Sequence, residues 1–337
     1  MNYRKIIGAG LAAVPAFLAL GIAADAPKVP LGLPPFDWPA NNPYSVEKVE
    51  LGRILYYDKR LSADDSVSCA TCHSPMFGFT DGAAVSTGIR KQKGGRSAPT
   101  VINRAYSQAQ FWDGRAASLE EQAKGPMANP IEMGNTHAAI VTRLKEVPGY
   151  APLFAKAFGS DGIDIERAAM AIATFERTVL SGNAPYDRYK RGDKKAMTAD
   201  QVRGMSVFFD KAKCDKCHEG SNFTLNAYHN LGVGTDKPEP DVGRFEVTKN
   251  PKDWGAFKTP TLREIGRTAP YMHDGSLKTL EEVVDFYNKG GGKNRNLDET
   301  MKELHLTDAE KKDLVAFMRA LNGEGWQQAK APTEFPQ

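Results

Sequence analysis

The segment Cys69-Ala70-Thr71-Cys72-His73 and the later segment Cys214-Asp215-Lys216-Cys217-His218 both follow the pattern C-x-x-C-H. This pattern is typical of the covalent attachment of a c-type haem. On a helix, positions i, i+3 and i+4 lie on one face, so two cysteine sulfurs and one imidazole can reach the same porphyrin. The sequence therefore predicts two haems, one held by Cys69, Cys72 and His73 and the other by Cys214, Cys217 and His218.

A zinc site with four cysteine ligands is the main alternative, because C-x-x-C also occurs in zinc sites and in redox dithiols. All four cysteines of the chain lie in the two motifs, and each motif ends in histidine. A zinc site would leave both histidines without a role. The 142 positions that separate Cys72 from Cys214 also exceed ordinary zinc-ligand spacing. We therefore favour haem attachment over zinc.

The composition is that of an ordinary globular protein. The chain has 337 residues, 41% of them hydrophobic and 25% charged, which is enough for about two domains. The net charge is only +3, and no long block of lysine or arginine is present, so we expect no binding to nucleic acid. The weak positive charge is compatible with an acidic partner but does not identify one.

Residues 1–26 have the pattern of a signal peptide. Two basic residues, Arg4 and Lys5, precede an apolar run of about 18 residues, and Ala24 and Ala26 offer a small-residue cleavage site. An uncleaved membrane anchor is the alternative, but the many glycines and alanines of the run favour cleavage. We therefore predict a periplasmic protein without stable membrane insertion after cleavage. With all four thiols bound to haem, no disulfide is expected.

Patterns of apolar residues predict a mainly α fold with long loops. Six prolines in residues 27–43 indicate an extended tether. Helices are expected after Ser45, Asp164, Thr198 and Thr307, where apolar residues recur at helical spacing, and the last three of these residues can cap a first turn. Sustained strand alternation is not evident.

A faint internal repeat indicates two related, cytochrome c-like haem domains. Three short segments recur 161 positions later in the chain, namely Pro99-Thr100 at Pro260-Thr261, Asp113-Gly114 at Asp274-Gly275, and Leu119-Glu120-Glu121 at Leu280-Glu281-Glu282. Three matches at one offset argue for a duplication. We therefore predict an N-terminal haem domain at residues 44–190, a C-terminal haem domain at residues 191–325 and a tail at residues 326–337.

The function of each haem depends on what lies opposite its histidine. Two strong ligands make an electron carrier, whereas an open position beside a proton-transfer group makes a peroxide-activating centre. In the first half, Met76 lies too close to His73 to bind from the other side, and Met127 is better explained by packing. His137 fits a surface or capping histidine at a helix start. These interpretations leave the first iron open.

Two further residues of the first half are candidates for a role in the reaction. Glu132 lies in a loop bounded by Pro130 and Gly134, which could hold a catalytic acid–base rigidly, and a solvated glutamate is an equal alternative. Trp112 could carry an electron between two haems, although aromatic residues usually pack in a core.

The second half offers three candidates for the distal ligand of its iron. Met272 and His273 are ordinary haem ligands, whereas Tyr287 would be a hard anionic ligand that stabilises ferric and higher oxidation states. The alternative role of Tyr287 is to pack at a helix end against the glycines at 290–292.

Taken in order, these motifs resemble those of the bacterial dihaem cytochrome c peroxidase and MauG family over residues 45–322. Besides the two haem motifs, the matching segments are Phe111–Ala116, Asn129–Gly134, Thr259–Arg263 and Ala269–Gly275. The resemblance implies that the first haem reacts with peroxide and the second transfers electrons. It implies that Trp112 lies between the haems, that Glu132 is the distal acid–base, and that Gln122 and Pro126 belong to the distal pocket. It also implies a possible Ca²⁺ ion between the haems.

Two departures from the common family pattern favour the MauG-like members. Ordinary dihaem peroxidases carry a loop histidine that blocks the first iron until the second is reduced, whereas the matching position here is Ile89. The distal methionine of the second haem aligns with Tyr287, as in MauG, so Met272 remains the alternative ligand. Two other positions differ from MauG itself, because Ala212 replaces its exit tryptophan and Ser97 replaces the asparagine of the calcium site.

We therefore predict a periplasmic, MauG-like dihaem c-type peroxidase. The resemblance implies that hydrogen peroxide generates high-valent haem iron, with Glu132 moving a proton between the peroxide oxygens, and that side chains of a partner protein are then oxidised. The first alternative is a cytochrome c peroxidase that removes peroxide with electrons from a small cytochrome or copper protein. The second alternative is an electron-transfer dihaem cytochrome without catalysis.

Overall fold

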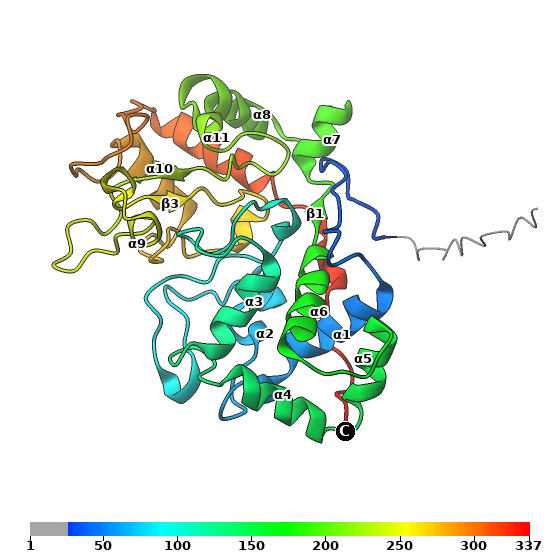
Figure 1. Ribbon diagram of the computed structural model, residues 1–337. Coiled ribbons are helices and arrows are strands. Elements are labelled where there is room, and N and C mark those ends of the chain that lie inside the picture. Colours follow the sequence, from blue (N-terminus) through cyan, green and yellow to red (C-terminus); the bar gives the residue numbers. More distant parts are fainter. Residues whose placement is uncertain (1–25) are drawn as a thin grey trace, which may run out of the picture.

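A computed structural model describes residues 26–337, and Figure 1 shows two groups of helices connected by long loops. The predicted signal peptide lies outside the described residues, apart from Ala26. Within the described part of the chain, no helix combines the length and the apolar character needed to cross a membrane.

The first group of helices is built around two helices that cross in close contact. Its members are α1 (Val46–Tyr57), α2 (Cys69–Cys72), α3 (Leu119–Ala128), α4 (His137–Glu146), α5 (Tyr150–Phe158) and α6 (Ile165–Arg177). Helices α1 and α6 approach so closely at Gly52 that a methyl group there would overlap the carbonyl of Ala171. The apolar face of α6 thereby becomes part of the buried core of this group.

The second group repeats this arrangement around another close helix pair. Its members are α7 (Pro185–Arg191), α8 (Ala199–Ser206), α9 (Phe245–Thr248), α10 (Leu280–Asn288) and α11 (Asp308–Arg319). A side chain at Gly204 of α8 would overlap the carbonyl of Asp313 in α11. The core of this group is rich in phenylalanine, and Phe208 and Phe317 pack with ring centroids 5.2 Å apart.

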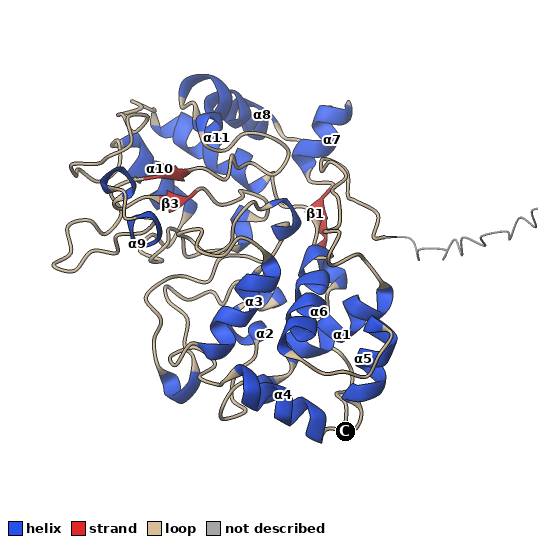
Figure 2. Cartoon of the chain, viewed as in Figure 1, coloured by secondary structure: helices blue, strands red, loops and turns tan. Residues whose placement is uncertain are grey.

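Strands contribute little to the fold, as Figure 2 shows. Strand β1 (Ser181–Gly182) pairs antiparallel with β4 (Glu324–Gly325), and β2 (Tyr228–His229) pairs antiparallel with β3 (Phe257–Lys258). The prediction of a mainly α fold with long loops is confirmed.

The four predicted helix starts are also confirmed, because each predicted residue precedes a helix and takes part in a hydrogen bond that caps its first turn. The hydroxyl of Ser45 and the carboxylate of Asp164 accept backbone N–H groups at 3.2 and 2.8 Å. Thr307 accepts the N–H of the third helical residue at 3.3 Å. At Thr198 the backbone N–H donates to the Gln201 side chain at 3.0 Å, as in a capping box.

Both terminal segments of the described chain pack against the helix groups. The carbonyl of Leu31, in the proline-rich segment, accepts the N–H of Asn183 at 2.7 Å, and the carbonyl of Pro34 accepts the hydroxyl of Tyr106 at 2.7 Å. Trp326, after the second group, is buried in the core of the first group. The proline-rich segment is therefore a strap along the surface, and the C-terminal end lies beside α4 and α5 (Figure 1).

Candidate functional site

The first C-x-x-C-H motif forms a single helical turn. Cys69 and Cys72 are the first and last residues of α2, and the backbone N–H of His73 donates to the Cys69 carbonyl at 2.9 Å. The turn is fixed at its start, where the N–H of Ser68 donates to the Thr71 hydroxyl at 2.9 Å. Burial lowers the pKa of His73, so its imidazole is neutral and can offer a lone pair to a metal.

The second motif presents its histidine in a similar way. Cys214 begins a 3-10 turn, and the N–H of His218 donates to the Cys214 carbonyl at 2.9 Å. The ring Nδ1 of His218 donates to the Phe223 carbonyl at 2.9 Å, which leaves Nε2 as the lone-pair nitrogen. Burial lowers the pKa of this imidazole to about 4. Both features are what an iron-binding histidine requires.

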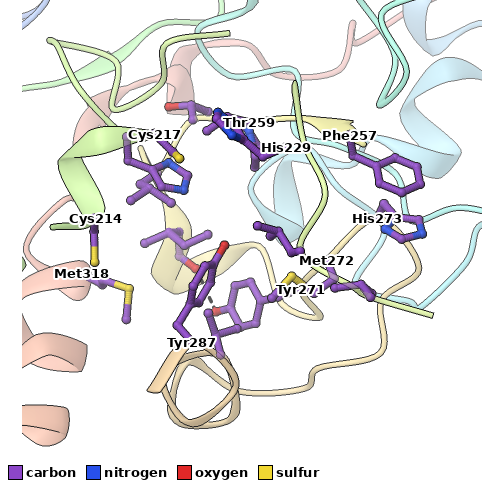
Figure 3. Close-up of a pocket in the computed structure, with 18 of the residues that line it drawn as sticks. Cys214, Cys217, His229, Phe257, Thr259, Tyr271, Met272, His273, Tyr287 and Met318 are labelled. Carbon is purple, nitrogen blue, oxygen red and sulfur yellow. Dashed lines mark hydrogen bonds between the residues drawn. The ribbon is translucent and has the colours of Figure 1, made fainter. Parts of the chain in front are cut away.

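A cavity of about 360 Å³ lies beside the second motif. Cys214, Cys217 and His218 line one part of its wall, and most of the remaining wall is apolar. Figure 3 shows Tyr287 of α10 projecting into this space together with Met272. A cavity with two cysteines, one imidazole and an apolar wall fits a covalently held porphyrin.

Two cations in the cavity wall are consistent with haem propionates. Within residues 26–337, the guanidinium of Arg104 forms no hydrogen bond or ion pair, and Lys258 is only 4% exposed with a single carbonyl contact at 3.5 Å. Burial lowers the pKa of Arg104 to about 10 and that of Lys258 well below its usual value, although Glu176 offsets part of the effect at Arg104. A cation withdrawn from water without an anionic partner, as Lys258 is, is unfavourable, so an anionic group in the cavity would stabilise Lys258 and could also pair with the partly exposed Arg104.

Both candidates for the second distal ligand, Tyr287 and Met272, are in the cavity wall, and the geometry alone does not choose between them. Burial raises the pKa of Tyr287, so a phenolate there would need a positive partner such as ferric iron. The third candidate, His273, is stacked on Phe257 with ring centroids 3.6 Å apart and planes 12° apart. This stacking occupies one face of the imidazole.

Trp112 lies where the two groups of helices meet. Its indole N–H donates to the Ser97 carbonyl at 2.8 Å, and its own carbonyl accepts the N–H of Lys258 at 2.7 Å. The side chain also lines the cavity beside the second motif. Trp112 is therefore fixed by two hydrogen bonds at the junction, and its role between the haems stays a prediction.

An ion-pair cluster also joins the two groups at this junction. The guanidinium of Arg96 donates to Asp113 at 2.6 Å and to Asp241 at 2.6 and 2.8 Å. Among the described residues, no group of three or more His, Cys, Asp or Glu side chains could hold a metal ion. Calcium between the haems therefore stays a prediction.

The Glu132 loop has the rigidity expected of an acid–base residue. The amide of Asn129 donates to Glu132 Oε1 at 2.8 Å, and the N–H of Gly134 donates to the Asn129 carbonyl at 2.8 Å. Burial raises the pKa of Glu132, and the charge of Arg115 partly opposes this effect. The carboxylate also lies near enough to the first motif to contribute to the raised pKa of Cys72, for which burial is the main cause. Glu132 is therefore a partly buried carboxyl group on the side of the first haem motif.

Gln122 and Pro126, the predicted distal-pocket residues, are four positions apart on α3 and share one of its faces. The carbonyl of Pro126 accepts the N–H of Met133 at 3.2 Å, which joins α3 to the Glu132 loop. The first residue of α4, His137, contacts the Lys124 carbonyl of α3 through Nε2 at 2.9 Å, and the capping residue of α4 is Thr136, whose hydroxyl accepts the N–H of Ala139 at 3.1 Å.

The loop that carries Ile89 is fixed against the Glu132 loop. The N–H of Ile89 donates to the Glu132 carbonyl at 2.9 Å, and Gln92 Nε2 donates to the Pro130 carbonyl at 3.1 Å. The buried Ile89 side chain packs against Gly134 in the space that a side chain at that position would fill. The sequence did not predict these contacts between the Ile89 loop and the Glu132 loop, which we call the latch. It also did not predict the cations Arg104 and Lys258 in the cavity wall, because no local sequence pattern indicates either feature.

Comparison with known proteins agrees with this architecture. The chain matches the family model for di-haem cytochrome c peroxidase over residues 46–195. It is 45% identical to methylamine utilization protein MauG of Methylorubrum extorquens, over 85% of this chain and 81% of that protein. It is 40% identical to cytochrome-c peroxidase IdrP1 of Pseudomonas sp. (strain SCT), over 96% of this chain and 94% of that protein.

Solved structures show the same similarity over both helix groups. A MauG-like protein associated with microbial copper homeostasis superposes with a TM-score of 0.83 and 35% identity, over 92% of this chain and 97% of that one. The diheme peroxidase BthA from Burkholderia thailandensis superposes with a TM-score of 0.73 at 24% identity, over 85% of this chain and 88% of that one. At that identity the second likeness shows the fold alone.

Proposed function

Because the chain belongs to the dihaem cytochrome c peroxidase family and is a hydrogen-peroxide-dependent oxidoreductase, we propose that it is a MauG-like enzyme that oxidises side chains of a partner protein. The observation that carries this proposal is the position of Tyr287, whose phenol projects into the cavity beside the second haem motif (Figure 3). A phenolate oxygen is a hard ligand that stabilises high oxidation states of iron. Oxidising equivalents stored in this way would be available to a protein partner.

When bound, the haems supply iron that reduces hydrogen peroxide and accepts oxidising equivalents. The protein supplies the proton transfer. The amide of Asn129 donates a hydrogen bond to Glu132 Oε1. The other carboxylate oxygen, Oε2, can therefore take a proton from one peroxide oxygen and return it to the other. Ile89 has no metal-binding atom, and its loop is tied to the Glu132 loop, which supports an open position at the first iron.

We also propose that the protein acts in the periplasm with haem covalently attached. The two motifs place two cysteines and one histidine within one turn each, as c-type attachment requires. Such attachment is an extracytoplasmic process, and residues 1–26 have the pattern of a signal peptide.

Replacement of Tyr287 by phenylalanine tests the proposed ligand. The absorbance and EPR spectra of the oxidised second haem should change, because its distal oxygen ligand is removed, and oxidation of a protein partner should slow. The Met272→Leu variant is the matched control, since Met272 lines the same cavity, and its spectra should match the parent protein. If only the Met272 variant changes the spectra, Met272 is the ligand and the MauG-like proposal loses its main support.

EPR of the resting oxidised protein separates the proposal from a simple electron carrier. An open position at the first iron should give a high-spin ferric signal. Two low-spin signals and no reaction with hydrogen peroxide would reject the enzymatic role of this site. Fast turnover with a reduced small cytochrome would instead favour peroxide removal as the main activity.

Exposed lysines beside the second motif support a protein partner with an acidic surface. Lys213, Lys216 and Lys302 lie at the mouth of the cavity, and within residues 26–337 none of the three forms a salt bridge. A positive rim around an electron-transfer site attracts a negatively charged partner and raises the association rate.

The double variant Lys213→Glu/Lys216→Glu should lower kcat/KM for an acidic single-domain cytochrome c by about 10-fold or more at low salt, because it reverses the steering charge. The difference should shrink as ionic strength rises. The rate of the reaction with hydrogen peroxide should stay unchanged. Lys145→Glu on α4 is the control and should behave as the parent protein. If Lys145→Glu lowered kcat/KM as much as the double variant does, the proposed docking face would be wrong.

A further inference from the structure

Four aromatic side chains form a continuous row that ends on the strap. The ring centroids of Tyr106 and Phe36 lie 5.4 Å apart, those of Phe36 and Trp38 lie 5.3 Å apart, and those of Trp38 and Tyr44 lie 5.0 Å apart. All four side chains are partly exposed. The hydroxyl of Tyr106 donates to the Pro34 carbonyl at 2.7 Å, which fixes the strap against the body of the protein.

The inner end of this row lies beside the cavity at the second haem motif. Tyr106 is the last residue of a 3-10 turn whose first residue, Arg104, lines the cavity. Asn226, nine residues after the second cysteine of the second motif, donates to the Tyr106 carbonyl at 3.4 Å. One short turn therefore connects the cavity beside the second haem motif to the aromatic row.

We propose that Trp38, with Tyr44 beside it, is a surface redox site through which oxidising equivalents leave the haem sites when no partner takes them at the cavity. The inference rests on the peroxide-dependent oxidation described above. Indole and phenol are the protein side chains that give up an electron most readily. Phe36 is not oxidised and serves as the bridge between Tyr106 and Trp38.

The electrons and atoms balance with hydrogen peroxide as the oxidant. Its reduction to two water molecules consumes two electrons and two protons. The row supplies two electrons, one from the indole of Trp38 and one from the phenol of Tyr44, and each of these groups releases its N–H or O–H proton to solvent. Tyr106 is a poor place for a lasting radical, because its hydroxyl faces the Pro34 carbonyl, which cannot take up a proton.

The experiment uses the intact haem-loaded protein and a small molar excess of hydrogen peroxide without an electron donor. Freeze-quench EPR should show an aromatic radical. When further hydrogen peroxide removes a second electron from the same ring, addition of water with loss of a proton leaves one oxygen on that ring. Peptide mass spectrometry should find this added oxygen concentrated at Trp38 and Tyr44. The Trp38→Phe variant should lose most of the radical signal. Trp254→Phe is the matched control, because Trp254 is also partly exposed but lies outside the row, and its signal should be unchanged.

The possible outcomes separate this inference from the proposed function. Consumption of peroxide with oxygen added at Trp254 or Tyr57 instead of Trp38 overturns the inference and leaves the peroxidase function intact. If the EPR radical signal of the Trp38→Phe variant is as strong as that of the parent protein, the inference is also wrong and the peroxidase function still stands. No consumption of peroxide by the parent protein overturns both. The mass-spectrometric result on the parent protein decides the question even if the Trp38 variant fails to fold.

Discussion

The Glu132→Gln variant is expected to react with hydrogen peroxide about 10²–10⁴-fold more slowly than the parent protein, which is the usual contribution of a positioned general acid–base. Glutamine keeps the size of the side chain and can still accept the hydrogen bond from Asn129. It cannot carry a proton from one peroxide oxygen to the other. Stopped-flow absorbance under excess peroxide measures the rate directly.

The pH dependence of the same reaction provides a second test of Glu132. Burial raises the pKa of this carboxyl group above its usual 4.5, and the base is active only when it is deprotonated. The rate in the parent protein should therefore rise with pH through this raised pKa and then level off, and the rise should be absent in the variant. Glu146→Gln, at an exposed position in α4, is the control. A Glu132 variant within a few-fold of the parent rate would show that Glu132 is not the acid–base.

The Asp187→Asn variant is expected to lose about 3–5 kcal/mol of unfolding free energy, because it leaves a buried arginine without its counter-charge. Arg263 and Asp187 are 1% and 4% exposed, and two hydrogen bonds of 2.6 and 2.9 Å join them. Arg263 also donates to the carbonyls of Ser221, at 2.6 Å, and Gly32, at 3.3 Å. Urea unfolding of the haem-loaded protein, followed by circular dichroism, measures the loss.

The control for this stability prediction is an exposed ion pair of the same type. Arg319 and Glu281 are paired at 3.1 Å with side chains 59% and 58% exposed, and Glu281→Gln should cost about 0–1 kcal/mol. Similar losses in both variants would mean that the Arg263–Asp187 pair contributes no more than a surface pair. A loss confined to the Asp187 variant would show that the buried Arg263–Asp187 pair stabilises the fold more than a surface ion pair does.

The parts of the structure that the sequence predicted correctly depend on local geometry. Ser45 and Asp164 precede helices because their side chains accept amide groups three residues ahead, and such contacts can be inferred from spacing alone. The two haem motifs could be predicted for the same reason, because one turn of backbone places two cysteines and a histidine together.

The parts that could not be predicted depend on contacts between distant segments. Arg104 and Lys258 are 154 positions apart in the sequence, and only the packing of the two helix groups brings them to one cavity. The latch between the Ile89 loop and the Glu132 loop is made mainly through backbone atoms, so no side-chain pattern reveals it. Tyr287 and Met272 reach the same cavity from different segments of the chain, which their spacing in the sequence does not reveal.

The strap has a consequence for how the protein matures. Its residues are the first of the described chain to be synthesised, yet Gly32 and Leu31 bind partners that come much later, Arg263 and Asn183. The earliest segment of the described chain can therefore complete its contacts only after the residues up to Arg263 have been synthesised. We expect a shortened N-terminus to leave the two helix groups joined through Arg96 and Trp112 but without the contacts that the strap makes to Asn183 and Arg263.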